Sequence, residues 1–197
     1  MRKRQLIAGA FVLLGAILLG FSLHTAPGSG WFYPATLGLA AIWVVGAYVV
    51  GPPRLGPRRP VLLPVAIGAV LVGVFVAGSF VVHQISFLDS QVREVADHAA
   101  RGSWPLLVLV TAVTGVAEEL FFRGALFDVV PRHQVAVTTA VYGVTTLATG
   151  NLLLAFAAVL LGLVVALERR RYDSLVGPIL THCTWSLSML FLLPTLF

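Results

Sequence analysis

The sequence of 197 residues contains few charged side chains and a single cysteine, and both shortages restrict the class of protein. Only 11% of the residues are charged, whereas 58% are hydrophobic. A soluble domain of this length could not cover so much apolar surface, so the composition predicts an integral membrane protein. With Cys183 alone, no internal disulfide can form. The net charge of +5 comes from arginines clustered between apolar runs, which indicates membrane topology rather than a nucleic-acid surface.

Seven apolar segments predict an all-α, polytopic transmembrane helical bundle, because about 20 apolar residues cross a bilayer as a helix. The segments cover residues 5–23, 31–50, 61–85, 104–130, 134–149, 152–167 and 175–197. We expect the first to be an uncleaved transmembrane helix, since the residues SLHTAPG after it make a poor signal-peptide cleavage site. The fifth and sixth are short and are divided only by a Thr-Gly-Asn turn. We expect two spans there, with a re-entrant pair as the alternative.

The basic residues between these segments predict the orientation of the chain. Arginine-rich connections alternate with arginine-poor ones. The basic ones lie at residues 2–4, 54–59, 132 and 169–171. The positive-inside rule then places the N-terminus inside and the C-terminus outside. Residues 89–101 fit a short interfacial helix on the outer side. No linker, low-complexity tract or clear internal repeat divides the sequence, so we expect one membrane domain over residues 1–197.

Three charges interrupt the fourth apolar segment, in the stretch GVAEELFFRG. A bilayer core penalises each such side chain by roughly 2.5–3.5 kcal/mol. On a helix, Glu119 and Arg123 are four residues apart in the favourable order for an ion pair. Glu118 points about 100° away and lacks that partner, which makes it a candidate general base. Ionisable residues inside membranes are more often functional than structural, and buried salt bridges contribute little stability, so we favour a functional site over a structural network.

One histidine, His182, lies inside an apolar segment, whereas the other four fall in or beside the connections. Ser186 follows one turn later and shares its helix face. The fifth segment carries a polar stripe at helical spacing. The stripe consists of Thr139, Tyr142, Thr146 and Thr149. These three segments could therefore bring polar groups together inside the bundle.

The residues around Glu118 resemble a known family. The sequence EELFFRG is similar to the first motif, E-E-x-x-x-R, of the CAAX-processing and bacteriocin-immunity family of intramembrane glutamic endopeptidases, the CPBP or Abi family. The third motif, H-x-x-x-N or H-x-x-x-D, is matched at His182, with Ser186 in place of Asn or Asp. The second motif, F-x-x-x-H, is degenerate: it aligns with Tyr142, and Thr146 stands where the family has histidine. The resemblance covers roughly residues 104–194.

The resemblance implies a role for each matched residue. Glu118 would activate a water that attacks the scissile carbonyl, and His182 would stabilise the oxyanion. Glu119 and Arg123, with Tyr142, would support the site, while Thr146 and Ser186 occupy the two altered catalytic positions. No metal or other cofactor is expected, because one histidine and two glutamates make a small ligand set beside the three protein ligands of a catalytic zinc site.

The altered positions leave two functions open within the family. Threonine cannot act as a base near neutral pH, and losing a base or an oxyanion donor costs roughly 10²–10⁴ in rate. The protein is therefore either an endopeptidase that cleaves a membrane-associated peptide or protein, or an inactive member that acts as a membrane binding or immunity protein. A proton-coupled transporter is a third reading, which the absence of an inverted repeat disfavours. We expect a multi-pass protein of a bacterial plasma membrane that binds no nucleic acid. Prenylated CAAX substrates are eukaryotic, so we expect another substrate.

Overall fold

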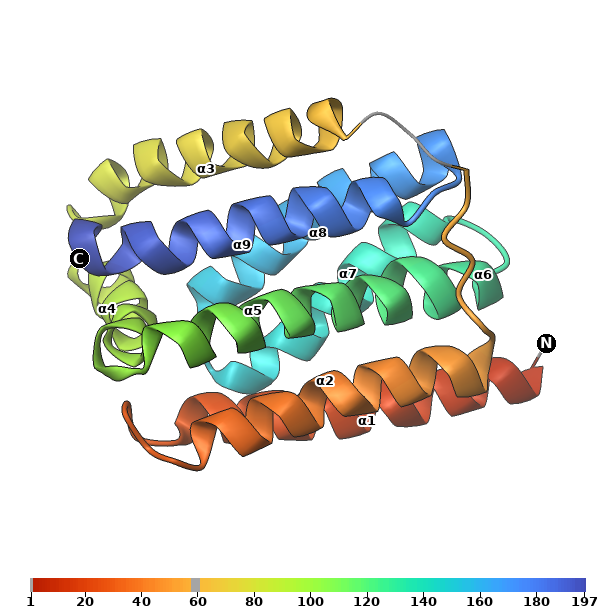
Figure 1. The fold of residues 1–197 in the computed structure, drawn as a ribbon, viewed down its shortest axis with the longest axis horizontal. Helices are drawn as coiled ribbons and strands as arrows, with labels where there is room; N and C mark the ends of the chain where they lie inside the picture. The colour runs from red at the N-terminus through yellow and green to blue at the C-terminus, as the bar shows by residue number, and fades with distance from the viewer. Residues whose placement is uncertain (1, 58–60) are drawn as a thin grey trace.

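The structure is a computed structural model that describes residues 2–57 and 61–197, and its ordered elements are all helical, as predicted. The α-helices are α1 (Arg2–His24), α2 (Phe32–Val50), α3 (Leu62–Val82), α4 (Ser86–Arg101), α5 (Trp104–Glu119), α6 (Phe127–Val129), α7 (Gln134–Thr146), α8 (Leu152–Tyr172) and α9 (Val176–Leu196). A π-helix, η1 (Leu120–Leu126), joins α5 to α6, and a 3-10 turn, η2 (Leu147–Thr149), follows α7. Figure 1 shows the long helices lying side by side, with α5 near the middle.

Six helical segments in the described part of the chain are long and apolar enough to cross a membrane. They are α1, α2, α3, the continuous helix Trp104–Val129, α8 and α9. The predicted span that is not among these six is the fifth, which corresponds to α7; its 13 residues cover roughly 20 Å against a hydrocarbon core of about 30 Å. The apolar helices indicate a multi-pass membrane protein. A seventh span and the inside location of the N-terminus stay predictions.

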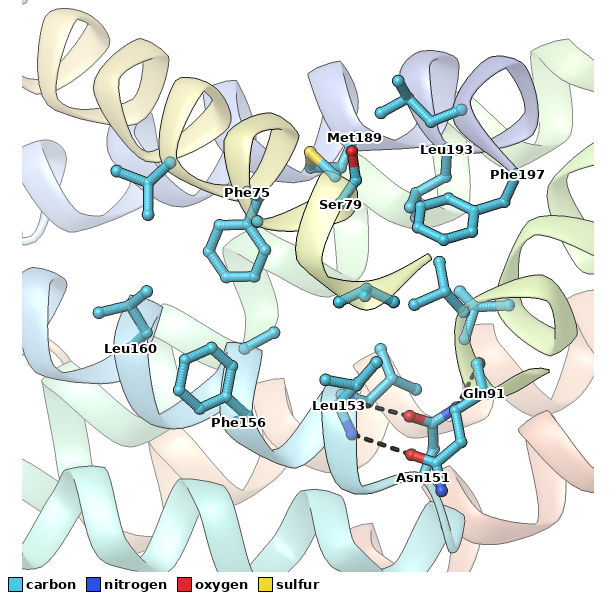
Figure 2. A pocket seen from close by; sticks show the side chains of 18 of the residues that line it. Phe75, Ser79, Gln91, Asn151, Leu153, Phe156, Leu160, Met189, Leu193 and Phe197 are labelled. Atoms are coloured by element: carbon cyan, nitrogen blue, oxygen red, sulfur yellow. Dashed lines mark hydrogen bonds between the residues drawn. The ribbon is translucent and has the colours of Figure 1, made fainter. Parts of the chain in front are cut away.

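The helix predicted at residues 89–101 is present as α4, and its apolar side faces the bundle. Val92 and Val95 line an apolar cavity of about 260 Å³ that α4 closes together with α3, α8 and α9. Gln91 attaches α4 to the start of α8: its carbonyl accepts from the Asn151 amide, and its side-chain oxygen accepts from the Leu153 N–H. Figure 2 shows these bonds at one end of the cavity. The position of α4 relative to a membrane stays a prediction.

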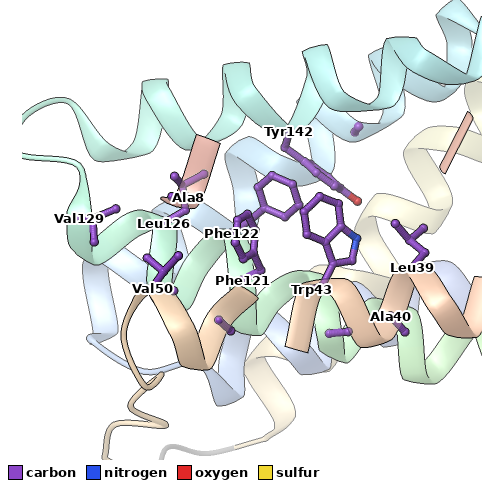
Figure 3. Packing of buried hydrophobic residues seen from close by; sticks show 14 residues of the cluster. Ala8, Leu39, Ala40, Trp43, Val50, Phe121, Phe122, Leu126, Val129 and Tyr142 are labelled. Atoms are coloured by element: carbon purple, nitrogen blue, oxygen red, sulfur yellow. The ribbon is translucent and has the colours of Figure 1, made fainter. Parts of the chain in front are cut away.

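An aromatic cluster fills the bundle beside the charges of the fourth predicted span. Trp43 of α2 packs against Phe121 and Phe122 of η1 with ring centroids 4.8 and 4.9 Å apart. Phe122 in turn contacts Tyr142 of α7 at 4.8 Å (Figure 3). These large rings exclude solvent, and each buries roughly 150–250 Å² of surface. The cluster therefore fixes η1, and the charged residues at its start, between α2 and α7.

The end of the sixth apolar segment differs from the prediction. We expected the helix to stop near residue 167 and Arg169 to lie in a basic connection. Instead α8 continues to Tyr172, and Arg169 is only 6% exposed. Its Nε donates to the Arg123 carbonyl at 3.0 Å, and its terminal nitrogens bind Asp128 and Asp173. These acceptors explain the longer helix, because they neutralise an arginine that would otherwise require solvent.

Arg169 is thus a support for η1 as well as a basic residue. The bond from its guanidinium holds the pKa of Asp173 below its usual range. Asp173 also closes α8 in the left-handed conformation, with φ 48°. The neighbouring Arg170 and Arg171 are exposed, so the three adjacent arginines have different roles.

We predict that Arg169→Gln destabilises the protein far more than Arg170→Gln. Losing hydrogen bonds to charged partners costs about 1.5–3 kcal/mol, whereas an exposed substitution usually changes stability by less than about 0.5 kcal/mol. Thermal unfolding of the two variants in detergent measures the difference. Equal melting temperatures would show that Arg169 does not support η1.

Candidate active site

The charged residues of the fourth predicted span lie where α5 passes into η1, inside the bundle. Glu119 and Arg123 are 0% exposed and Glu118 is 8% exposed. A helix that widens to i→i+5 hydrogen bonding over one segment is rare and often occurs at functional sites. Here the π-helix contains Arg123 and directs it toward α7 and α8.

Glu119 is bonded to both of its predicted neighbours through one oxygen. Its Oε1 accepts from Arg123 Nη1 at 3.1 Å, as the four-residue spacing predicted. The same Oε1 lies 2.8 Å from His182 Nδ1. A carboxylate can only accept, so Nδ1 must carry the proton of this hydrogen bond. Glu119 therefore fixes the orientation of the imidazole and directs Nε2 away from itself.

Glu118 faces the other side of the same imidazole. His182 Nε2 lies 3.9 Å from Glu118 Oε2. The Tyr142 hydroxyl donates to the same Oε2 at 2.5 Å. Glu118 is thus held by a neutral donor from α7, while Arg123 binds Glu119. The two adjacent glutamates have different partners, as their 100° separation on a helix predicts.

Arg123 is held on several sides besides its ion pair. Its guanidinium lies 4.8 Å from the centre of the Tyr142 ring, within cation–π distance. At Gly162 of α8, an added Cβ would lie 2.9 Å from Arg123 Nη2 and 3.1 Å from the Tyr142 ring. Glycine at this position therefore lets α8 approach close enough to enclose both side chains.

A cavity of about 280 Å³ lies beside Glu118, with walls from α5, α7, α8 and α9 and further lining residues from α1, α2 and α4. Glu118, Tyr142 and His182 line it, as do the residues at the two altered motif positions, Thr146 and Ser186. The Thr146 hydroxyl donates to the Tyr142 carbonyl of its own helix at 3.0 Å, so its proton is not free for a ligand. The Ser186 hydroxyl is buried and makes no hydrogen bond with any described residue. All seven residues singled out from the sequence thus lie in or directly behind one site.

Two buried residues near this site were not identified from the sequence. Arg169 was interpreted as part of a basic connection. Glu168 of α8 is 5% exposed, and neither carboxylate oxygen has a hydrogen-bond partner among the described residues. Glu168 and Arg169 belong to the charged sequence ERRRYDS, which is typical of a solvent-exposed connection. Their burial could not be predicted without knowing that α8 continues to Tyr172.

The site residues present few metal ligands. Within residues 2–57 and 61–197, no three His, Cys, Asp or Glu side chains are grouped closely enough to hold a metal ion. Glu119 is already engaged by Arg123 and His182. That the reaction needs no metal stays a prediction.

Comparison with known proteins agrees with the resemblance found in the motifs. Residues 100–188 match the family model described as Rce1-like type II CAAX prenyl endopeptidase. The match confirms the predicted resemblance to the CAAX-protease family and supports an intramembrane protease kind of function. The matched region includes Glu118, Tyr142, His182 and Ser186. Neither the curated proteins nor the solved structures contain a significant match.

We predict that Arg123→Ala lowers the yield of folded protein more than Glu118→Gln does. Removing Arg123 leaves Glu119 without its cationic partner, and breaking a buried pair typically costs about 3–5 kcal/mol. Glutamine at 118 keeps the shape of the side chain and can still accept from Tyr142. Size-exclusion profiles of both variants extracted from membranes measure the yields. Equal yields would contradict the division into a supporting pair and a reactive glutamate.

Proposed function

We propose that the protein is an intramembrane endopeptidase in which Glu118 activates the water that hydrolyses a peptide bond. The family match supports the kind of function. The observation that carries the mechanism is the 3.9 Å separation of Glu118 Oε2 and His182 Nε2 on the wall of one cavity. A water can donate one hydrogen bond to each of two acceptors at this separation.

The bond from Glu119 favours a role for His182 that differs from the predicted oxyanion donor. With its proton on Nδ1, a neutral imidazole presents a lone pair at Nε2. His182 then orients the water and shares its activation with Glu118. Glu119 thus orients the imidazole of His182, and the imidazole acts on the water. Catalytic bases are commonly oriented in this way by a further hydrogen-bonding group.

The reaction needs no group outside the chain other than water. Glu118 accepts one proton as the water oxygen bonds to the carbonyl carbon, and the π electron pair of the carbonyl moves onto its oxygen. The C–N bond then breaks, and Glu118 returns the proton to the departing amine. The products are a carboxylic acid and an amine, and no covalent intermediate forms on the protein. Tyr142 keeps Glu118 in place by donating to the oxygen that faces His182.

The proposed substrate is a peptide or protein segment within or beside the bilayer, because the site lies among apolar helices. From the motif resemblance and the apolar helices, we also place the protein in a bacterial plasma membrane. A membrane binding or immunity protein without activity is the second candidate. It is favoured by Thr146, since the second-motif position supplies no base and its hydroxyl bonds to its own helix.

Glu118→Gln should lower cleavage by about 10²–10⁴, because a general base is lost without a change of shape. The assay incubates purified protein in lipid vesicles with a pool of synthetic single-span and membrane-tethered peptides and detects new termini by mass spectrometry. Glu94→Gln, an exposed glutamate on α4, is the matched control and should cleave like the wild type. Cleavage that survives Glu118→Gln would contradict the assigned base. No cleavage by the wild type would favour the binding protein.

Thr146→His should raise the cleavage rate, because an imidazole at the second-motif position could share the base role near neutral pH. Thr146→Val, with nearly the same shape as threonine and no titratable group, is the control and should give no gain. The same peptide pool measures both variants. If histidine gives no gain over valine while the wild type is active, residues 142–146 do not correspond to the second motif.

A further inference from the structure

The site cavity extends toward the end of the bundle where α4 lies. Near that end it is lined by Leu23 of α1, Phe32 of α2 and Val95 of α4. Figure 1 shows α4 and the connection between α1 and α2 at this same end, where α5 begins. Glu118 lies farther along α5, roughly 21 Å from the start of that helix. A peptide that entered here would have to pass between α4 and the α1–α2 connection, residues 25–31, before it reached Glu118.

The passage between these segments is narrow. A crevice of about 10 Å³ lies between α4, the end of α1 and the start of α8. Leu23, Val95 and Leu154 line both this crevice and the site cavity, so the two spaces adjoin. A space of this size holds about one water. In this conformation the crevice can therefore pass the water that hydrolysis consumes, but it cannot pass a peptide.

A buried histidine contributes contacts that hold α4 against the first two helices. His98 is 7% exposed and lines the crevice. Its Nε2 donates to the Thr25 carbonyl at 3.0 Å, and its ring lies 5.4 Å from the Phe32 ring. Just beyond α4, the Ser103 N–H donates to the Tyr33 hydroxyl at 2.7 Å. These contacts close the crevice on the side of the α1–α2 connection.

The packing under α4 favours movement at this place. Val92 and Val95 both line the apolar cavity, and Val95 also lines the site cavity. Protein interiors are normally filled, and a segment with few close contacts opens at low cost in free energy. Short connections, residues 83–85 and 102–103, attach α4 to α3 and α5. The longer connection at residues 25–31 is therefore the part that can move farther.

We propose that residues 25–31 and α4 form a gate that opens to admit a substrate peptide to Glu118. This inference rests on the proposed endopeptidase function. In the closed gate, the hydrogen bond from His98 to Thr25 holds the two sides together while the crevice still admits water. Movement of residues 25–31 away from α4 breaks that bond and opens the site cavity at this end of the bundle. Loops that close over active sites commonly control access in this way.

The gate can be locked by a reversible disulfide. A Cβ at Gly28 would lie 3.6 Å from the Arg101 Cβ, within the range of about 3.5–4.5 Å found in disulfides. The ion pair of Arg101 with Asp97 is exposed, so its loss costs little stability. Gly28→Cys/Arg101→Cys is combined with Cys183→Ala, which removes the native thiol. The oxidised protein should lose most of its cleavage of a peptide that the Cys183→Ala protein cleaves, and reduction should restore it.

Two controls accompany the locked protein. Its reduced form controls for the strain of a side chain at Gly28, whose φ is 82°. Gly143→Cys/Val159→Cys, also with Cys183→Ala, controls for oxidation and for crosslinking itself. A Cβ at Gly143 would lie 3.9 Å from the Val159 Cβ, so this pair joins α7 to α8 and leaves the gate free. Its oxidised and reduced forms should cleave at the same rate.

A second readout does not depend on cleavage. Thr111 lines the site cavity, and Thr111→Cys places a thiol there, again with Cys183→Ala. The rate at which a water-soluble maleimide modifies this thiol measures how often the gate opens. Locking the gate should slow the modification. His98→Phe should speed it, because phenylalanine keeps a ring but cannot donate to the Thr25 carbonyl.

Equal cleavage by the oxidised and reduced forms of the locked protein, with an unchanged rate of thiol modification, would overturn the gate and leave the endopeptidase function intact. An equal loss of cleavage on oxidation of the Gly143–Val159 pair would also overturn it, because any crosslink would then inhibit. If the wild type cleaves no peptide, the endopeptidase function fails, and the rates of thiol modification then decide whether residues 25–31 and α4 form a gate.

Discussion

The site depends on a single carboxylate oxygen that accepts two hydrogen bonds inside an apolar bundle. Glu119 Oε1 accepts one hydrogen bond from Arg123 of its own continuous helix and one from His182 of α9. Charged groups are costly to bury, and they are tolerated when each is paired and hydrogen-bonded. Because the hydrogen bond between Glu119 and His182 joins α5 to α9, it fixes the rotation of α9 relative to α5. That rotation also brings His182 Nε2 toward Glu118.

The surrounding structure holds this interaction in place. The rings around Trp43 exclude solvent from the start of η1, and Gly162 allows α8 to enclose Arg123. Arg169 binds the Arg123 carbonyl from the end of α8 and connects it to two carboxylates near the bundle end. These contacts come from α2 and α8, so two helices besides α5 and α9 help to determine the position of Glu119. Glu119 Oε2 and the Nε and Nη2 atoms of Arg123 nevertheless have no hydrogen-bond partner among the described residues, and the same holds for several polar atoms around the cavity.

The sequence predicts what lies within one helix better than what lies between helices. The four-residue spacing gave the Glu119–Arg123 pair, and hydropathy gave six of the seven apolar helices at crossing length. Spacing alone could not predict that His182 bonds Glu119 rather than Glu118, because that depends on how α9 is rotated against α5. The widened helix from Leu120 and the burial of Arg169 were also missed. Both follow from tertiary contacts, which override local pattern when a buried acceptor is near.

The central claim is that Glu119 holds a proton on Nδ1 of His182 and leaves Nε2 free to orient a water. Selective ¹⁵N labelling of histidine and solid-state NMR in lipid vesicles at neutral pH measure this directly, with His182→Gln used to assign the signals. The account predicts a protonated Nδ1 and an unprotonated Nε2 for His182. A proton resident on Nε2 would contradict it, because Nε2 could then only donate, and Nε2 and Glu118 could not jointly accept from a water.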